Sequence, residues 1–349
     1  MPRSGAHNRG LERAMSVLAV IPCLNEAEHL DGLLTQMLGD QTYTKLVVAD
    51  GGSDDGSLAI IAQHQARDPR LKLLDNPDRI QSAGINRAVA QYGDGMDWLV
   101  RIDAHCLYPD NYGAQLIAIA ERENADAVVV PMVTRGNEGW QKATAIAQNS
   151  ALGTGGSAHR HLSKGQWVDH GHHALMRVEA FKQLGGYCEQ MPCNEDAEFD
   201  VRQTKEGLRI WLDPAPAITY FPRKSLGALA RQYFRYGTGR ARTVRRHKVR
   251  MKLRQLIPVG IFCALCAVPL AFLHPIFAAP AALWALACLA YGVWAGIKAG
   301  GGGMAMLSGI PAMIMHASWG AGFTAEWLGN RAGDRPKYGL QDEPGDTRV

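Results

Sequence analysis

Short apolar runs alternate with amphipathic stretches along the first 130 residues of the chain. Such runs, when rich in Val and Ile, are typical of buried strands, whereas apolar residues three or four apart are typical of helices. The pattern predicts strands at 16–21, 45–49, 71–74, 98–102 and 127–132, and helices at 28–38, 57–67, 82–92 and 111–123. Strands that alternate with helices favour an α/β fold, with a mostly parallel sheet and helices on both faces.

The charge pattern changes in the second half of the chain. No Asp or Glu occurs from residue 214 to 325, and segment 223–254 carries twelve Lys and Arg residues. Because the formal net charge is only +4, the remainder of the chain is acidic and the basic character is local. A local basic segment suits nucleic acid or anionic lipid. The uncharged stretch that follows, residues 256–297, favours membrane lipid as the partner and no nucleic acid.

The uncharged stretch predicts membrane-spanning helices, because about 20 apolar residues cross a bilayer as a helix. Together with a later apolar block it predicts spans at 256–273, 276–297 and 304–323, with a turn near 273–275. The cations before the first span predict that the preceding domain stays on the cytoplasmic side. The predicted organisation is therefore a disordered leader (1–14), an α/β domain (15–222), a basic interfacial segment (223–254), a transmembrane region (255–325) and a polar tail (326–349).

Polar residues gather where the first two predicted strands end. Pro22, Asn25 and Glu26 follow the first strand, and Asp50 and Asp54 follow the second. Ligands of parallel sheets bind beyond the carboxyl ends of the strands, where carboxylates can accept hydrogen bonds from a ribose or a base. The same residue types also build turns and cap helices, so this reading stays open beside the first.

A candidate metal site follows the fourth predicted strand. One residue separates Asp103 from His105, which places both side chains on the same side of an extended segment. An oxygen and a nitrogen ligand together suit Mn²⁺, whereas Mg²⁺ prefers oxygen alone. Either ion would bridge a diphosphate and offset the charge of a leaving group.

Two further clusters carry candidate chemistry. Segment 194–200 contains four carboxylates, and among them Glu195 and Asp196 are candidates for a general base. Gln232 and Arg235 lie three residues apart in the basic segment, so we expect them to share a helix face and to bind a diphosphate or an acceptor.

Taken in this order, the motifs resemble those of inverting family-2 glycosyltransferases of the GT-A type. The resemblance extends over roughly Ser16 to Arg242 and rests on Pro22 to Glu26, Asp50 to Gly56, Asp103-Ala104-His105, Glu195-Asp196 and Gln232 to Tyr236. It implies a nucleotide-sugar site formed by Pro22, Asn25, Glu26, Asp50, Asp54, Arg79, Asn86, Asp103, Gln232, Arg235 and Tyr236. It also implies Mn²⁺ or Mg²⁺ held by Asp103 and His105, and Asp196, beside Glu195, as the catalytic base.

Two residues depart from the family pattern. His105 stands where a second Asp is usual, and Tyr236 stands where Trp is usual. The Asp-Ala-His form together with C-terminal spans is most similar to the group that makes succinoglycan-type exopolysaccharides in the bacterial inner membrane. That likeness implies a UDP-sugar donor, with glucose expected, and a polyprenyl-diphosphate-linked glycan as acceptor.

Other functions stay open at this stage. Within the family, the acceptor would alternatively be a polyprenyl phosphate or a glycolipid. A non-catalytic membrane receptor with a nucleotide-binding domain would have the same spans and basic segment. A dinucleotide-dependent oxidoreductase should show Gly-x-Gly-x-x-Gly after the first strand, and residues 22–26 contain no glycine.

Overall fold

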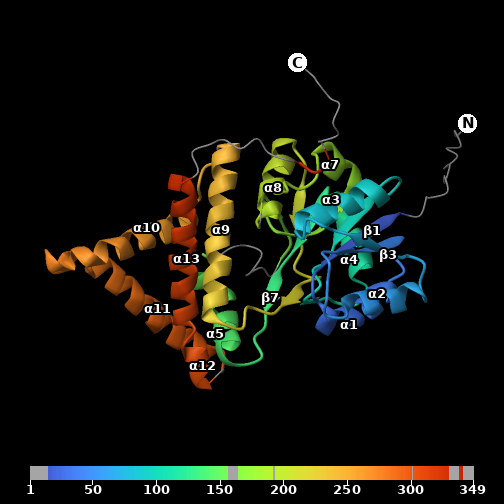
Figure 1. Ribbon diagram of the computed structural model, residues 1–349. Helices are drawn as coiled ribbons and strands as arrows, with labels where there is room; N and C mark the ends of the chain where they lie inside the picture. Colours follow the sequence, from blue (N-terminus) through green and yellow to red (C-terminus); the bar gives the residue numbers. More distant parts are fainter. Residues whose placement is uncertain (1–14, 156–163, 192, 301, 330–337, 341–349) are drawn as a thin grey trace, which may run out of the picture.

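The computed structural model describes residues 15–155, 164–191, 193–300, 302–329 and 338–340. The predicted leader, residues 1–14, and most of the predicted polar tail lie outside the described residues. The chain forms an α/β domain and a layer of long helices beside it (Figure 1).

An eight-stranded mixed sheet forms the centre of the α/β domain. Its strand order is β3-β2-β1-β4-β9-β6-β10-β8. The strands are β1 (Val17–Cys23), β2 (Lys45–Asp50), β3 (Leu71–Asp75), β4 (Trp98–Arg101), β6 (Ala127–Val130), β8 (Gln166–Val168), β9 (His172–Arg177) and β10 (Ile210–Leu212). Strands β1 to β4 are parallel, whereas β9 is antiparallel to both of its neighbours. The five predicted strands are present, and the expected mostly parallel sheet is confirmed.

A small second sheet adjoins the first. It consists of β5 (Cys106–Leu107), β11 (Ile218–Tyr220) and β7 (Met132–Thr134), in that order. Strand β5 comes five residues after β4, and β7 comes two residues after β6. Two segments that leave the main sheet are therefore joined here through β11.

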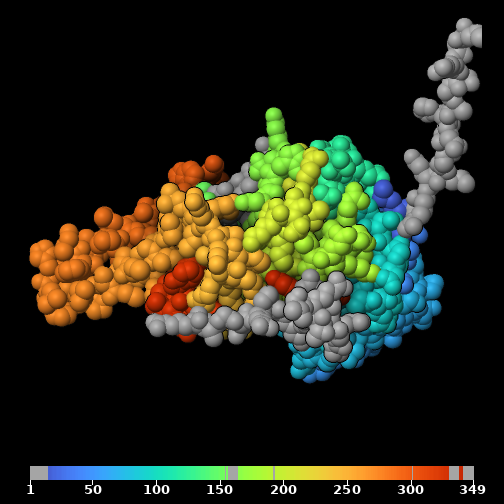
Figure 2. Space-filling model, turned by 90° about the horizontal axis from the view of Figure 1, so that it is seen from above, coloured from blue at the N-terminus to red at the C-terminus, as the bar shows by residue number. Residues whose placement is uncertain are grey.

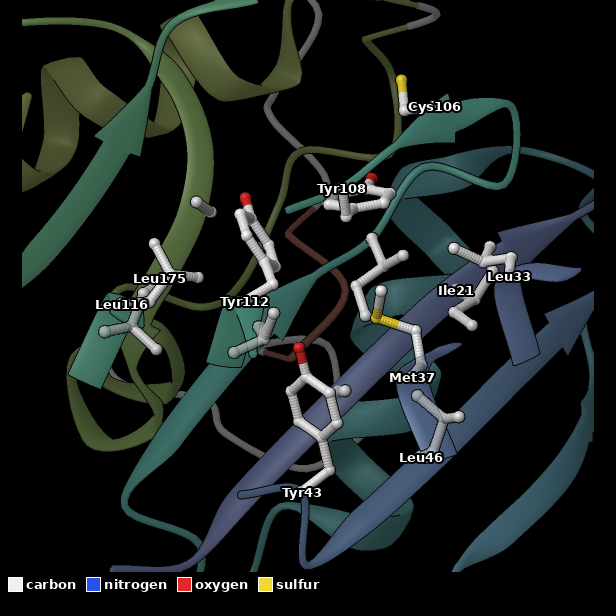
Figure 3. Packing of buried hydrophobic residues seen from close by; sticks show 14 of the residues in the cluster. Ile21, Leu33, Met37, Tyr43, Leu46, Cys106, Tyr108, Tyr112, Leu116 and Leu175 are labelled. Atoms are coloured by element: carbon white, nitrogen blue, oxygen red, sulfur yellow. The ribbon is translucent and has the colours of Figure 1, made fainter. Parts of the chain in front are cut away.

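Helices cover both faces of the main sheet. Helices α1 (Ala27–Gly39), α2 (Ser57–Gln65) and α4 (Tyr112–Glu123) lie on one face, and α3 (Gln81–Tyr92), α7 (Val178–Gln183) and α8 (Glu195–Lys205) lie on the other. Successive side chains of a strand point to opposite faces. Accordingly Ile21 packs with the first set of helices (Figure 3), and Val20 packs with the second. The continuous apolar runs of the sequence are thus explained by burial on both faces.

The helical layer is centred on two parallel helices, α9 (Leu226–His247) and α13 (Gly309–Gly329). Glycines allow their backbones to touch: a Cβ on Gly237 would lie 2.0 Å from the carbonyl oxygen of Trp319, and a Cβ on Gly322 would lie 2.0 Å from that of Phe234. At one end, Arg242 of α9 donates to Glu326 of α13 at 3.1 Å. Helices α5 (Gly139–Gln148) and α6 (Ala151–Thr154) pack against the other end.

A helical hairpin projects from this pair, away from the α/β domain (Figures 1 and 2). Its arms are α10 (Leu253–Ala267), continued by the 3₁₀ turn η2 (Val268–Phe272), and α11 (Ala279–Lys298). A further turn, η3 (Pro275–Phe277), joins them, as the sequence predicts. By length and composition, Leu253–Phe272 and Ala279–Lys298 are apolar enough to cross a membrane.

The predicted third span, 304–323, stays a prediction. Within the described part of the chain only the two arms of the hairpin are long and apolar enough to cross a membrane. The third block is divided between a short helix, α12 (Gly302–Met306), and α13. Helix α13 runs along α9, and its Glu326, which lies beyond the predicted span, pairs with Arg242 and Arg245.

Candidate active site

Sheet topology brings the predicted clusters to one edge. Strands β2, β1 and β4 are adjacent and parallel, so the loops that follow them leave the same edge of the sheet. Strand β9 is antiparallel to β4, so its first residue, His172, lies at that edge too. The chain order reverses between β1 and β4, which is where open α/β sheets bind ligands.

The first two loops are joined to each other. The backbone N–H of Asn25 donates to the Ser53 hydroxyl at 2.9 Å, and the N–H of Asp54 donates to the side-chain oxygen of Asn25 at 2.9 Å. The carboxylate of Asp50 is buried and accepts from the N–H groups of Gly52 and Ser53, at 2.8 and 3.0 Å. Turn chemistry therefore accounts for much of what Asp50 does, as the alternative reading of the sequence held.

The other residues predicted to bind the nucleotide sugar lie in different places. Arg79 donates to the carbonyl oxygens of Gly51 and Gly52 and so braces the Asp50 loop, while Pro22 lies within β1. Asn86 lies elsewhere: its buried amide bonds to both backbone groups of Tyr187 and to Glu189. With these bonds made, Asn86 joins α3 to the segment before α8, which is a structural role.

Arg101 connects the metal motif with the acidic run. Its guanidinium lies 3.3 Å from Asp103 and 3.1 Å from Glu195, and only 6% of the residue is exposed. Burial would raise the pKa of Asp103, but Arg101, His172 and His105 outweigh it and hold that pKa well below its usual range. The sequence analysis missed Arg101. The available signal was a charged residue that ends an otherwise apolar strand.

His105 and His172 flank Asp103. The Nδ1 atom of His105 lies 3.1 Å from Glu26, whose hydrogen bond raises the pKa of His105 against the effect of burial. His172, also missed by the sequence analysis, places its Nε2 3.7 Å from the Oδ2 of Asp103. Burial lowers the pKa of His172 to about 4, so its imidazole is neutral at pH 7, the form that binds metal.

The separation of His172 and Asp103 allows a test of the metal hypothesis. A distance of 3.7 Å is too long for a hydrogen bond. It is short enough for one ion at about 2.1 Å from each atom. Among the described residues no group of three or more His, Cys, Asp or Glu side chains is arranged to hold a metal. Asp103 and His172 would thus suit a divalent ion that few protein side chains hold.

The four carboxylates of the acidic run point to different partners. Glu195 pairs with Arg101, Glu198 pairs with Arg202 and His247, and Asp200 lies between His170 and His173 at 2.9 and 2.7 Å. Burial raises the pKa of Asp200, but the two histidines outweigh it and lower that pKa to about 2. Helix α8 separates successive side chains by about 100°, so the carboxylates of one short run have different neighbours.

Asp196 is the exception in this run. Its carboxylate accepts from the N–H of Ala197 at 2.7 Å, and within the described residues no other side chain bonds to it. It is half-buried at the start of α8, next to the Glu195 that pairs with Arg101. A carboxylate held by its own helix and not claimed by a cation is suited to accept a proton from a substrate.

Gln232 and Arg235 lie three residues apart on α9, as predicted, but their side chains have different neighbours. The amide of Gln232 donates to the hydroxyls of Tyr220 and Tyr236, at 3.1 and 3.0 Å, on the side of the α/β domain. Its oxygen is buried and has no hydrogen-bond partner in the described part of the chain. Arg235 instead lines a groove between α9, α10 and α13.

Comparison with known proteins agrees with this arrangement. Residues 18–185 match the family described as Glycosyl transferase family 2. The chain is 47% identical, over 90% of its length and 95% of the relative, to "Succinoglycan biosynthesis protein ExoA" of Rhizobium meliloti (strain 1021). It is 22% identical, over 71% of its length and 79% of the relative, to a Methanococcus voltae protein named dolichyl N-acetyl-alpha-D-glucosaminyl phosphate 3-beta-D-2,3-diacetamido-2,3-dideoxy-beta-D-glucuronosyltransferase.

Among solved structures, the chain resembles mannosyltransferase PcManGT of Pyrobaculum calidifontis, in a complex with GDP-Man and Mn²⁺. The TM-score is 0.54 at 17% identity, and the match covers 89% of this chain and 87% of that one. At this identity the likeness shows a shared GT-A fold. The identity to ExoA, in contrast, extends over nearly the whole of both chains. The resemblance stated from the motifs is confirmed, the receptor alternative is excluded, and the chain belongs to glycosyl transferase family 2 as a glycosyltransferase.

Proposed function

We propose that the enzyme transfers glucose from UDP-glucose to an oligosaccharide carried on a polyprenyl diphosphate, in the biosynthesis of an exopolysaccharide. The name of the 47% identical relative, a succinoglycan biosynthesis protein, supports this class of product. The single observation that carries the reaction type is Asp196. No described side chain bonds to its carboxylate, and it is next to Glu195, which pairs with Arg101 at the end of β4.

Inversion at the anomeric carbon requires that a proton leave the acceptor hydroxyl as the new bond forms. Asp196 takes this proton in our proposal. Glu195 does not, because its carboxylate faces Arg101. Burial raises the pKa of Glu195, Arg101 opposes that shift, and Asp196 adds to it. Glu195 and Arg101 are therefore positioning residues, which connect the acceptor side to Asp103.

The donor would lie across the loops after β1, β2 and β4. Asn25, Glu26, Asp50 and Asp54 would face its nucleoside, with Arg79 holding the Asp50 loop in shape. Mn²⁺ or Mg²⁺ would be held by Asp103, with His105 and His172 beside it, and would offset the charge of the departing diphosphate. Gln232 and Tyr236 would close the site from α9.

We further propose that the enzyme resides in the bacterial inner membrane, with the α/β domain in the cytoplasm. The exposed apolar side chains of the α10–α11 hairpin support this, among them Phe272 at 81% and Leu283 at 67%. Two spans return the chain to its starting side, so a reporter fused after Val349 should be cytoplasmic. A periplasmic reporter would restore the three-span topology.

The proposed reaction is tested by the release of UDP from a panel of UDP-sugars. The assay uses membranes that contain the native acceptor lipid, with and without Mn²⁺. We expect release from UDP-glucose that depends on both the lipid and the metal. Equal release without lipid would indicate hydrolysis and would reject the acceptor.

A polyprenyl phosphate as direct acceptor is the second candidate. The Methanococcus voltae relative, whose name describes transfer to a sugar carried on dolichyl phosphate, supports a lipid-linked sugar over the bare lipid phosphate, although only 22% of residues are identical. Replacing the native lipid by a polyprenyl phosphate alone separates the two. Glucosylation of that lipid at the native rate would favour the second candidate.

A further inference from the structure

An apolar groove opens where α10 leaves the α9–α13 pair. Its volume is about 630 Å³, within the range of roughly 300–1,000 Å³ that small-molecule sites occupy. The lining is almost entirely apolar and comes from three helices, namely Ala230 and Phe234 of α9, Phe262 and Leu265 of α10, and Ala317 and Ala321 of α13. Small side chains on α9 and α13 leave the space, and larger ones on α10 form its wall.

Two arginines give the groove a polar end. Arg231 and Arg235, one helical turn apart on α9, also line the groove, and both are exposed. Neither forms an ion pair with any residue that the structure describes, although Arg242 and Arg245 further along the same helix pair with Glu326. Two adjacent cations beside an apolar wall are complementary to an anionic head group on an apolar chain.

The segment just before the acidic pair contacts α9 near the polar end of the groove. The thiol of Cys193 donates to the backbone carbonyl of Arg235 at 3.1 Å, and the amide of Asn194 donates to that of Tyr236 at 2.8 Å. Glu195 and Asp196 follow directly in the chain. Burial raises the pKa of Cys193 to about 12, with Glu195 and Asp196 adding to the shift and Arg235 opposing it. Both the acidic pair and the arginine therefore act on this one thiol.

We propose that the groove binds the first part of the prenyl chain of the acceptor, with the diphosphate at Arg231 and Arg235 and the sugar directed toward Asp196. This inference rests on the proposed function, because it specifies how a lipid-linked acceptor would be held. Along α10 the groove leads into the predicted first span, so the remainder of the chain would pass into the bilayer. A membrane phospholipid has no need to present its head group to a catalytic carboxylate, and therefore we assign the groove to the acceptor.

The test is photolabelling of the full-length enzyme in vesicles. The probe is a long-chain polyprenyl phosphate with a diazirine on its chain. We expect crosslinks in the peptides that contain Phe262 and Ala321, and we expect unlabelled polyprenyl phosphate to suppress them. Suppression by an equal excess of phosphatidylglycerol would mean a general phospholipid site and would overturn the proposal. Labelling spread evenly over α11 would overturn it too.

Variants that fill the groove sharpen this test. Ala321→Trp from α13, and independently Ala230→Phe from α9, should lower labelling by at least about tenfold, a loss equivalent to 1.4 kcal/mol. The matched control is Leu286→Trp, on the exposed surface of α11 and outside the groove, which should label as the wild type does. Two variants from different helices guard against misfolding of one. Normal labelling of both would reject the groove.

The outcome for the groove is separable from the outcome for the reaction. Labelling does not require catalysis, so an enzyme that releases no UDP with any lipid-linked acceptor would still report whether the groove holds a prenyl chain. Conversely, an enzyme that transfers sugar to the native lipid at an unchanged KM in both filled variants would keep its proposed function and lose the groove.

Discussion

The catalytic edge and the α10–α11 hairpin differ in which side chains they bury and which they expose. At the edge, charged groups are buried beside partners: Arg101 is 6% exposed and contacts two carboxylates. On the hairpin, large apolar side chains face outward, and Phe272 is 81% exposed. A buried charge is stable only with a counter-charge, and a large apolar surface requires a cover other than water. The contrast indicates that ion pairs within the protein stabilise the edge, whereas the hairpin requires an apolar environment outside the protein.

The largest effect is expected from breaking the pairing at Arg101. Arg101→Met leaves Asp103 and Glu195 buried without their cation, which should cost about 3–5 kcal/mol of stability. Thermal unfolding of the detergent-solubilised enzyme measures the loss. The control is Arg87→Met, which breaks a half-exposed pair with Asp78 and should cost at most about 1 kcal/mol. Similar losses from both variants would contradict the contrast between edge and surface.

A second expectation separates chemistry from folding at the edge. Asp196→Asn keeps the shape of the side chain and removes its basicity, so transfer should fall by roughly 10²-fold or more. Donor binding and thermal stability should stay unchanged, because the carboxylate of Asp196 bonds only to its own helix. Transfer rates and donor affinity are measured on the same preparation.

Asp200→Asn is the matched control for that variant. It removes a buried carboxylate from two histidines, so it should destabilise the protein measurably while a folded fraction still transfers sugar. Because the folded pKa of Asp200 is depressed to about 2, its contribution to stability is present at neutral pH and is lost as pH falls below about 4. Near-normal transfer by Asp196→Asn, with loss of transfer in Glu195→Gln, would show that the base is misassigned.

The third expectation concerns the metal. A chelator should abolish transfer, and Mn²⁺ should restore it best. If His172 helps to hold the ion, His172→Ala should weaken Mn²⁺ affinity by at least about tenfold, since even residues that only orient metal ligands contribute that much. His170→Ala is the control in the same segment, because His170 bonds to Asp200 and not to Asp103. Equal Mn²⁺ titrations for the two variants would remove His172 from the site.

The sequence predicted the edge well because its residues follow strands directly. The loops after β1, β2 and β4 could be located from apolar runs alone, and neighbouring parallel strands necessarily bring their exits together. His172 and Arg101 were not predicted. The position of His172 depends on β9 pairing antiparallel with β4, a contact between distant segments that no local pattern contains. The role of Arg101 depends on its ion pair with Glu195, which lies far along the chain.

The helical layer was predicted less completely, for a related reason. Composition located the hairpin, because two uncharged stretches are a local property. Composition also suggested a third span, which stays a prediction. Whether an apolar helix lies in lipid or against another helix depends on its neighbours, and Gly237 and Gly322 allow α13 to pack closely on α9. In the same way, residue spacing placed Gln232 and Arg235 on one face of α9. It could not show that Gln232 bonds to Tyr220, whereas Arg235 lines the groove.

The smallest effect is expected where the two regions meet, at the exposed cations after α9. Lys248 and Arg250 form no ion pair with the described residues, and each should contribute about 1 kcal/mol to holding the domain at an anionic surface. The double change to Gln should therefore lower transfer a few-fold in vesicles with anionic lipid, and have no effect in neutral vesicles. Arg67→Gln, on the far side of the α/β domain, is the control. Since the hairpin anchors the protein in either case, the loss reflects tilting of the domain away from its acceptor. Identical rates in both kinds of vesicle would leave the basic segment as a topology signal alone, and catalysis would depend on the hairpin and the groove without help from surface charge.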